Sequence, residues 1–265
     1  MSRFAAMAFL FLALALYLVL GAHRLDLPGI QYDEAKEAGL NAMELITGQP
    51  VTAFRGATVQ FGPWHLPLMD QDYIGNLNVL LAIPFLWIGG VTVVALRWLP
   101  LLIGAATLCV VWAIGRRLGG VLPATVASLL IAVNPSFVYW NRQGIFVTNL
   151  TAFFLVASLL SGLRWWEKRR SRDLWLTAFL FGMGLYSKLL FVWAICAMLA
   201  VLAIVTLCEA FGRNGRSAAR EGHSMAPWWL QWGIAGVCFL VPLIPLVLFN
   251  LRTSGTLTAL FGNLG

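Results

Sequence analysis

The residues of this chain that could do chemistry are a few charged side chains set among long apolar runs, and the first of them is the acidic pair Asp33-Glu34. A carboxylate here could act as general base on an acceptor hydroxyl, or hold a metal ion. Asp33 could equally cap a helix, because an acidic side chain in the first turn gains roughly 0.3–1 kcal/mol from the helix dipole. Spacing alone leaves both interpretations open.

Three cations could serve the same site. Arg142 ends a predicted span, Lys188 separates two apolar runs, and Arg97 lies where a long loop returns to apolar sequence. Each has a plainer interpretation, as a snorkelling arginine, an exposed lysine in a surface turn, and a helix anchor. A carboxylate and several cations on one membrane face suit a phosphate-linked, membrane-bound substrate, because cations bind the phosphate and stabilise the charge that builds on it as it leaves.

The composition indicates what must position these residues. The chain has 265 residues, of which 60% are hydrophobic and 11% charged, whereas about a quarter of a soluble domain is charged. This apolar surface fits a bilayer rather than a water-soluble core. The net charge of +7 comes from short basic clusters between apolar runs, so we expect membrane lipids and no nucleic acid as partners.

Apolar runs of about 20 residues predict the spanning helices. The candidate spans are residues 4–20, 97–114, 121–139, 145–163, 174–186, 189–208 and 228–249. The first is interpreted as a retained span rather than a cleaved signal peptide, because Gly21-Ala22-His23 is a poor cleavage site.

The positive-inside rule then sets the topology. The basic clusters at 116–117, 164–172 and 213–220 fall on one side only if the apolar run 74–91 does not cross. The expected fold is therefore all-α, a polytopic bundle of about seven spans within a single domain, 1–265. Its N-terminus is cytoplasmic, and residues 22–97 form a first outer loop that contains most of the carboxylates.

Within that loop, residues 33–47 predict a short amphipathic helix of the juxtamembrane type. Ala35, Ala38, Ala42 and Leu45 form one stripe, with a polar stripe of Glu34, Glu37, Asn41 and Glu44 beside it. Spacings of three and four are typical of a helix, which could lie flat on the membrane surface. Gly48 is the predicted stop.

A series of loose motifs resembles a known family. They are Tyr32-Asp33-Glu34-Ala35, Asp72-Tyr73-Ile74-Gly75, Ile88-Gly89-Gly90, Ala95-Leu96-Arg97-Trp98-Leu99-Pro100, Asn134-Pro135 with Asn141-Arg142-Gln143-Gly144, and Gly182-Met183-Gly184-Leu185-Tyr186-Ser187-Lys188. In order and spacing over residues 1 to about 208, the chain resembles GT-C membrane glycosyltransferases. The resembling group includes protein O-mannosyltransferases and aminoarabinose transferases that act on lipid A.

The resemblance implies an inverting enzyme that moves a sugar from a polyprenyl-phosphate carrier to an acceptor hydroxyl of a lipid, protein or glycan. It implies a place in the cell (inner) membrane, with the active site on the outer, periplasmic face. Asp33 would be the general base and Glu34 its neighbour in acceptor or metal contact. Arg142 and Lys188 would hold the carrier phosphate, and Arg97 and Tyr73 would join them in binding substrate.

The cofactor is left open. Some relatives place an acidic residue near positions 149–151, where this chain has Asn149 and Thr151, so no residue is predicted as a metal ligand. Family members have further spans, so we expect the N-terminal part of a longer architecture. Two other functions remain: a transporter or flippase of a lipid-linked or anionic substrate, and a non-catalytic assembly subunit.

Overall fold

The computed structural model describes residues 3–144, 146–212 and 227–262, and most of these residues are helical. The long helices follow the apolar runs of the sequence. Their bounds are α1 Arg3–Ala22, α5 Val93–Gly119, α6 Val121–Ala132, α7 Pro135–Arg142, α8 Phe146–Lys168, α9 Ser171–Ser187, α10 Val192–Gly212, α11 Trp228–Leu240, α12 Ile244–Thr253 and α13 Gly255–Gly262. Single 3₁₀ turns, η3 Leu189–Phe191 and η4 Val241–Leu243, precede α10 and α12.

The segment between α1 and α5 holds the remaining elements. They are α2 Tyr32–Glu34, the π-helical turn η1 Ala35–Gly39, α3 Leu40–Thr47, the 3₁₀ turn η2 Phe54–Gly56, β1 Thr58–Phe61, β2 Trp64–Pro67, β3 Met69–Gln71, β4 Ile74–Gly75 and α4 Leu77–Gly89. Two small antiparallel pairs form, β1 with β2 and β3 with β4.

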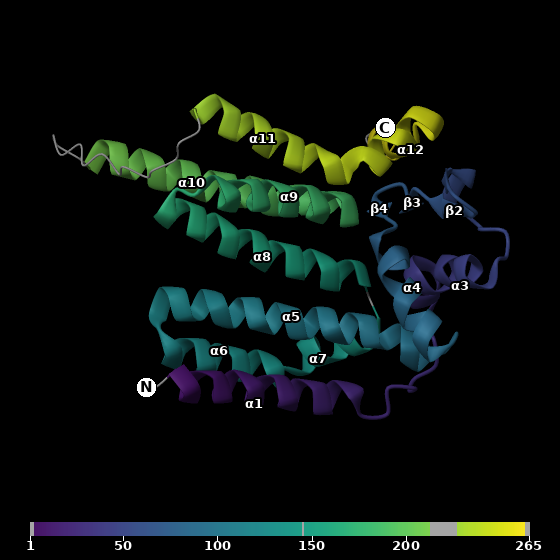
Figure 1. Ribbon diagram of the computed structural model, residues 1–265, viewed down its shortest axis with the longest axis horizontal. Helices are drawn as coiled ribbons and strands as arrows, with labels where there is room; N and C mark the ends of the chain where they lie inside the picture. The colour runs from purple at the N-terminus through teal and green to yellow at the C-terminus, as the bar shows by residue number, and fades with distance from the viewer. Residues whose placement is uncertain (1–2, 145, 213–226, 263–265) are drawn as a thin grey trace.

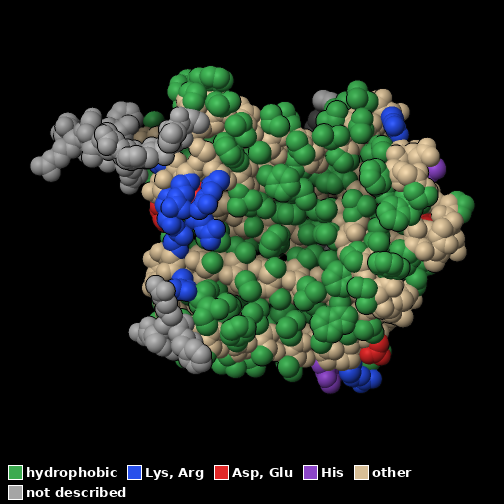
Figure 2. Space-filling view, in the orientation of Figure 1, with side chains coloured by type: hydrophobic (Ala, Val, Ile, Leu, Met, Phe, Trp, Pro, Cys, Tyr) green, Lys and Arg blue, Asp and Glu red, His purple; other side chains and the backbone are tan. Residues whose placement is uncertain are grey.

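The long helices pack into a bundle whose flank is apolar. Helix α5 contacts α6 and α8, α8 contacts α9, and α9 contacts α11, while α1 packs on α6; Figure 1 shows them running roughly parallel. Exposed large hydrophobic side chains cover the space between the two ends in Figure 2. A surface of this kind is stable in a lipid bilayer and costly in water.

Length and composition identify fewer spans than the expected seven. Three helices of the described residues are long and apolar enough to cross a membrane, and a bent pair raises the number to four. Helix α1 and helix α4 are shorter apolar helices by the same criterion. The membrane-helical class is therefore established, whereas the count of about seven spans is not confirmed.

The predicted span 121–139 is broken rather than continuous. Helices α6 and α7 meet at a bend of 58°, because proline keeps the preceding residue out of the helical region and gives up its own N–H. Asn134 is extended (φ −67°, ψ 120°), and its side chain accepts from the Phe137 N–H. A new helix thus begins at Pro135, where proline is favoured.

The two ends of the bundle differ in charge. At one end Arg117 of α5 pairs with Glu167 of α8, and Ala6 and Leu10 of α1 pack near Trp112 and Ala124. The strands, α3 and α4 gather at the opposite end (Figure 1). The basic clusters at 116–117 and 164–172 therefore share one end, as the topology requires, and residues 22–97 occupy the other. The third cluster, 213–220, lies outside the described residues.

The predicted helix at 33–47 is present. Helical structure is continuous from Tyr32 to Thr47, and it ends at Gly48, whose φ of +70° suits glycine. Ala38 and Ala42 are completely buried against α4. The polar stripe differs from a solvated face, because all four of its members are buried as well. Packing on both sides makes this helix a core element of the loop.

Candidate functional site

Glu34 and Arg97 form an ion pair at the centre of this end of the bundle. Both side chains are 0% exposed, and the contact is two-pronged: Arg97 Nε lies 2.7 Å from Glu34 Oε1 and Nη2 lies 2.9 Å from Oε2. Arg97 also donates to the carbonyls of Leu25 (2.8 Å) and Gly29 (3.1 Å). The Gln31 N–H donates to Glu34 (3.2 Å). A buried pair is tolerated only when its remaining groups are satisfied in this way.

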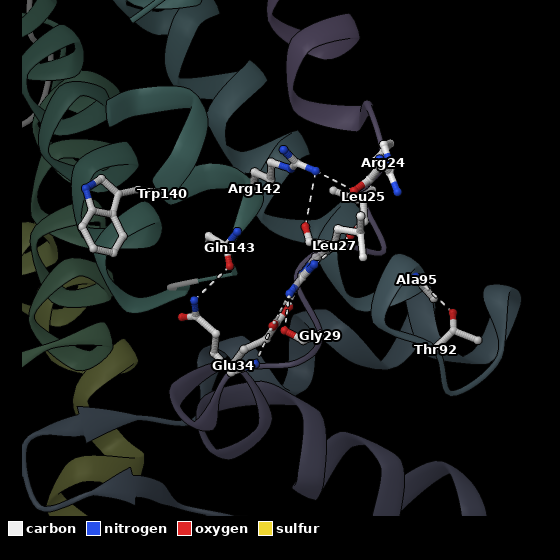
Figure 3. A network of polar contacts seen from close by, with 12 residues as sticks. Arg24, Leu25, Leu27, Gly29, Glu34, Thr92, Ala95, Trp140, Arg142 and Gln143 are labelled. Carbon is white, nitrogen blue, oxygen red and sulfur yellow. Dashed lines mark hydrogen bonds and ion pairs between the residues drawn. The ribbon is translucent and has the colours of Figure 1, made fainter. Parts of the chain in front are cut away.

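Arg142 binds the same loop from the end of α7. Its Nη2 donates to the carbonyls of His23 (2.7 Å), Arg24 (2.5 Å) and Leu27 (3.3 Å). Figure 3 shows the loop running between Arg142 and Glu34. The buried Nε has no hydrogen-bond partner among the described residues. Nη2 thus fixes the position of the guanidinium on the loop, while Nε makes no hydrogen bond to the described residues.

Asp33 stands at the surface of this assembly. Its side chain is exposed, and no hydrogen bond or ion pair holds it among the residues that the structure describes. It does not cap the helix, since the N-cap is Gln31. The Gln31 side chain donates to the side chain of Gln143 (3.0 Å), which follows Arg142 in sequence. The segment that carries Asp33 is thus tied directly to the segment that carries Arg142.

Lys188 ends α9 in an extended conformation (φ −154°, ψ 126°). It forms an isolated antiparallel bridge with Ile74 of β4, and the Leu189 N–H donates to the Tyr73 carbonyl (2.9 Å). Tyr73 is 42% exposed. This bridge places the loop residue Tyr73 beside Lys188, far apart though they are in the sequence.

A buried polar network holds that bridge in place. The Tyr186 hydroxyl, which has one proton to donate, faces two acceptors, the Leu68 carbonyl (2.9 Å) and the Asn76 side-chain oxygen, and the Asn76 amide donates to the Pro67 carbonyl. Gly75 lies against the backbone and ring of Tyr186 so closely that a Cβ would overlap both. The absence of a side chain at position 75 is what lets β4 reach α9.

The loop also holds a buried carboxyl group with a raised pKa. Asp70 of β3 is buried, and the loss of solvent raises the pKa of its carboxyl to about 7. The charge of Glu37 raises that pKa further, and the charge of Lys36 lowers it. Helix α3 contacts strand β2, so this part of the loop packs beside the helical stretch that starts at Tyr32.

The structure brings the predicted site residues to one end of the bundle in two groups. One group is built around the loop 23–34 and contains Asp33, Glu34, Arg97 and Arg142; the other is built around β4 and contains Tyr73 and Lys188. Among the described residues, no group of three or more His, Cys, Asp or Glu side chains could hold a metal ion. That Glu34 and Arg97 contact substrate stays a prediction, since each side chain is held by the other.

The sequence does not predict the hydrogen bonds that hold each group together. Gln31 and Asn76 are uncharged and lie outside the motifs, and the motifs that contain Gln143 and Tyr186 do not indicate the partners of these side chains. From the sequence, Asp70 is a further candidate in the loop, together with Arg55 and Asp72. The burial of Asp70 depends on how the loop folds around β3, and no local sequence pattern indicates it.

Comparison with known proteins gives one match. A family model described as dolichyl-phosphate-mannose-protein mannosyltransferase matches residues 79–213, just over half of the chain. The match includes Arg97, Arg142 and Lys188, whereas Asp33, Glu34 and Tyr73 precede it. No curated protein and no solved structure matches.

Proposed function

Because this chain belongs to the dolichyl-phosphate-mannose-protein mannosyltransferase family, we propose that it transfers a sugar from a polyprenyl-phosphate carrier to an acceptor hydroxyl, with inversion at the anomeric carbon. The family description makes a mannosyl donor and a protein hydroxyl the first substrates to test. A lipid or glycan acceptor offers the same reacting group.

In the proposed reaction, the carboxylate of Asp33 takes the proton of the acceptor hydroxyl as the oxygen attacks the anomeric carbon. The bond from that carbon to the phosphate oxygen breaks, and the electron pair leaves with the polyprenyl phosphate. Arg142 and Lys188 bind that phosphate and stabilise its growing charge. Attack from the side opposite the leaving group inverts the anomeric centre.

One observation carries this proposal: the exposed, unbonded carboxylate of Asp33 lies on a segment tied to that of Arg142, and Lys188 is bridged to the same loop at Ile74. Asp33 follows Gln31, which bonds to Gln143 next to Arg142. The buried Glu34–Arg97 pair holds the loop against α5. Much of the rate acceleration of such an enzyme comes from this kind of positioning.

In this proposal Glu34 and Arg97 act mainly as positioning residues. The guanidinium of Arg97 donates to a carboxylate and to two carbonyls, which leaves it little capacity for a phosphate. Tyr73, which is partly exposed beside Lys188, is proposed to contact the donor or the acceptor.

The orientation is also a proposal. The basic clusters at the far end of the bundle favour the cytoplasm, which puts Asp33, Arg142 and Lys188 on the outer face of the cell membrane. The carrier chain would then remain in the bilayer while its phosphate reaches the site.

Transfer by the purified full-length protein tests the proposal. The protein is incubated with a labelled polyprenyl-phosphate sugar and an acceptor peptide, and the product linkage is determined by nuclear magnetic resonance. A covalent product of inverted configuration supports the proposal. A product of retained configuration contradicts the mechanism, and movement of the intact donor across vesicles without a covalent product favours a flippase.

A further inference from the structure

The end of the bundle opposite the proposed site carries an exposed basic surface. Seven arginines and lysines belong to the ends of α5, α8 and α9 there: Arg116, Arg117, Arg164, Lys168, Arg169, Arg170 and Arg172. Figure 2 shows a dense group of basic side chains at this end, beside the broad apolar flank. Lys168, Arg170 and Arg172 are exposed.

The acidic residues of these helix ends neutralise only part of this charge. Glu167 pairs with Arg117 at 2.8 Å, and Asp173 is buried and also acts on Arg117. Within the described parts of the chain, no carboxylate forms an ion pair with Lys168, Arg170 or Arg172. Arg117 is therefore neutralised by carboxylates of the protein itself. The exposed Lys168, Arg170 and Arg172 remain available to bind an anion.

Tryptophans mark the depth of these cations in the bilayer. Trp165 and Trp166 end α8, and Trp165 meets Trp232 of α11 edge to face at 5.8 Å. Trp228 and Trp229, at the start of α11, are exposed. Indole rings gather at the level of the lipid headgroups, so the cations beside them lie at the level of the lipid phosphates.

Arg169 adds a feature that packing alone does not explain. It has a φ of +50°, in the left-handed region that ordinarily favours glycine. Its guanidinium stacks over both Trp165 (5.0 Å) and Trp166 (4.3 Å). The turn between α8 and α9 is thereby fixed to the tryptophan layer, which holds the neighbouring cations on one surface.

We propose that Lys168, Arg170 and Arg172, held over the tryptophan layer of α8 and α11, bind the phosphate headgroups of anionic phospholipids. These exposed cations lie at the level of the lipid headgroups, and this position favours a lipid phosphate over a soluble anion as their ligand. Basic residues next to spanning helices bind anionic lipids in this way. The surface is remote from Asp33, so the proposal is independent of the transfer reaction.

Thermal unfolding in lipid nanodiscs tests it. The full-length protein is placed in discs of phosphatidylcholine alone or of phosphatidylcholine with phosphatidylglycerol. The anionic lipid is expected to raise the melting temperature of the native protein. Removing the three charges in Lys168→Gln/Arg170→Gln/Arg172→Gln is expected to remove most of that rise and to weaken lipid binding on the order of 100-fold.

Matched variants and probes separate the outcomes. The charge-keeping variant Lys168→Arg/Arg170→Lys/Arg172→Lys should respond as the native protein does, and added salt should reduce the response. An equal melting temperature in both lipids, or a full response of the neutralised variant, overturns the proposal. Stabilisation by inorganic phosphate in place of the lipid overturns it as well, because the site would then be one for a soluble anion.

A second measurement does not depend on the neutralised variant folding. Native mass spectrometry of the unaltered protein should retain phosphatidylglycerol at low salt and lose it as salt rises, with phosphatidylcholine retained less at every salt concentration. Equal retention of the two lipids contradicts the proposal.

Discussion

Arg97 holds Glu34 through two parallel contacts across 63 positions of sequence, with both side chains excluded from solvent. The pair joins the first turn of the loop helix to the start of α5. It therefore sets the position of Asp33, the residue immediately before Glu34.

Breaking this pair should destabilise the protein strongly. Glu34→Gln or Arg97→Ala leaves a buried charge without its partner, which costs about 3–5 kcal/mol. Arg97→Lys should not restore stability, because an ammonium cannot reproduce the forked contact. Thermal unfolding of the purified variants measures the effect.

The exposed ion pair of the same loop is the matched control. Arg55 and Asp72 pair at 2.8 Å with partly exposed side chains, and pairs of this kind contribute little to stability because solvent screens them. Arg55→Gln should therefore change stability little. Equal losses in Arg55→Gln and Arg97→Ala would mean that the buried pair has no special structural role.

Asp70 should make stability depend on pH. Burial raises the pKa of its carboxyl to about 7, above the value of about 3.9 in an unfolded chain. Between these values the folded protein binds more protons, so the free energy of unfolding falls as pH rises, by at most about 1.4 kcal/mol per pH unit. The contribution is complete below about pH 4 and is lost once the pH passes about 7.

Unfolding profiles of Asp70→Asn across this range check the prediction. The variant should lose much of the slope between about pH 4 and pH 7, whereas Asp26→Asn in the same loop should keep it, since Asp26 is exposed. A slope unaltered by Asp70→Asn assigns the dependence to other groups.

Gly75→Ala should disturb the bridge that positions Lys188. The added Cβ would overlap the Tyr186 backbone and ring, and overpacking of this kind costs about 1–3 kcal/mol. Gly29→Ala, in the same loop, meets no atom within 4 Å and is the matched control. We expect a lower melting temperature and a higher KM for the lipid donor in Gly75→Ala only; identical behaviour of the two variants would refute the close contact.

Lys188→Gln should lower transfer without lowering stability. In the described part of the structure its side chain makes no hydrogen bond or ion pair, so its removal breaks no internal contact. Loss of one group that stabilises transition-state charge costs on the order of 10²-fold in kcat. Arg24 is an exposed cation at the same end, and Arg24→Gln should leave kcat unchanged. A similar loss of kcat in both variants would mean that any nearby positive charge has this effect, and would contradict a specific role of Lys188.

Some of this arrangement was predictable from sequence because it is encoded locally. Spacings of three and four predicted the helix that ends at Gly48, and the distribution of basic clusters predicted that the loop and the described clusters lie at opposite ends. The bend before Pro135 was missed although Asn134-Pro135 signals a helix start. The unbroken hydrophobicity of residues 121–139 outweighed that signal.

The rest depends on contacts between distant segments. Glu34 and Glu37 belong to a stripe that looks solvated in sequence, yet both are buried. Glu34 pairs with Arg97, and no helical or strand period connects the two residues. Because charge type is visible in a sequence and pairing is not, the site residues could be named before their partners could.

The central claim is that Asp33 is the general base of sugar transfer, and Asp33→Asn tests it most directly. The substitution keeps the shape of an exposed side chain and removes its basicity, with Asp26→Asn as the matched control in the same loop. Loss of a general base should lower kcat for transfer from the lipid carrier roughly 10²- to 10⁴-fold, with the melting temperature nearly unchanged. Turnover of Asp33→Asn equal to that of Asp26→Asn would contradict the account.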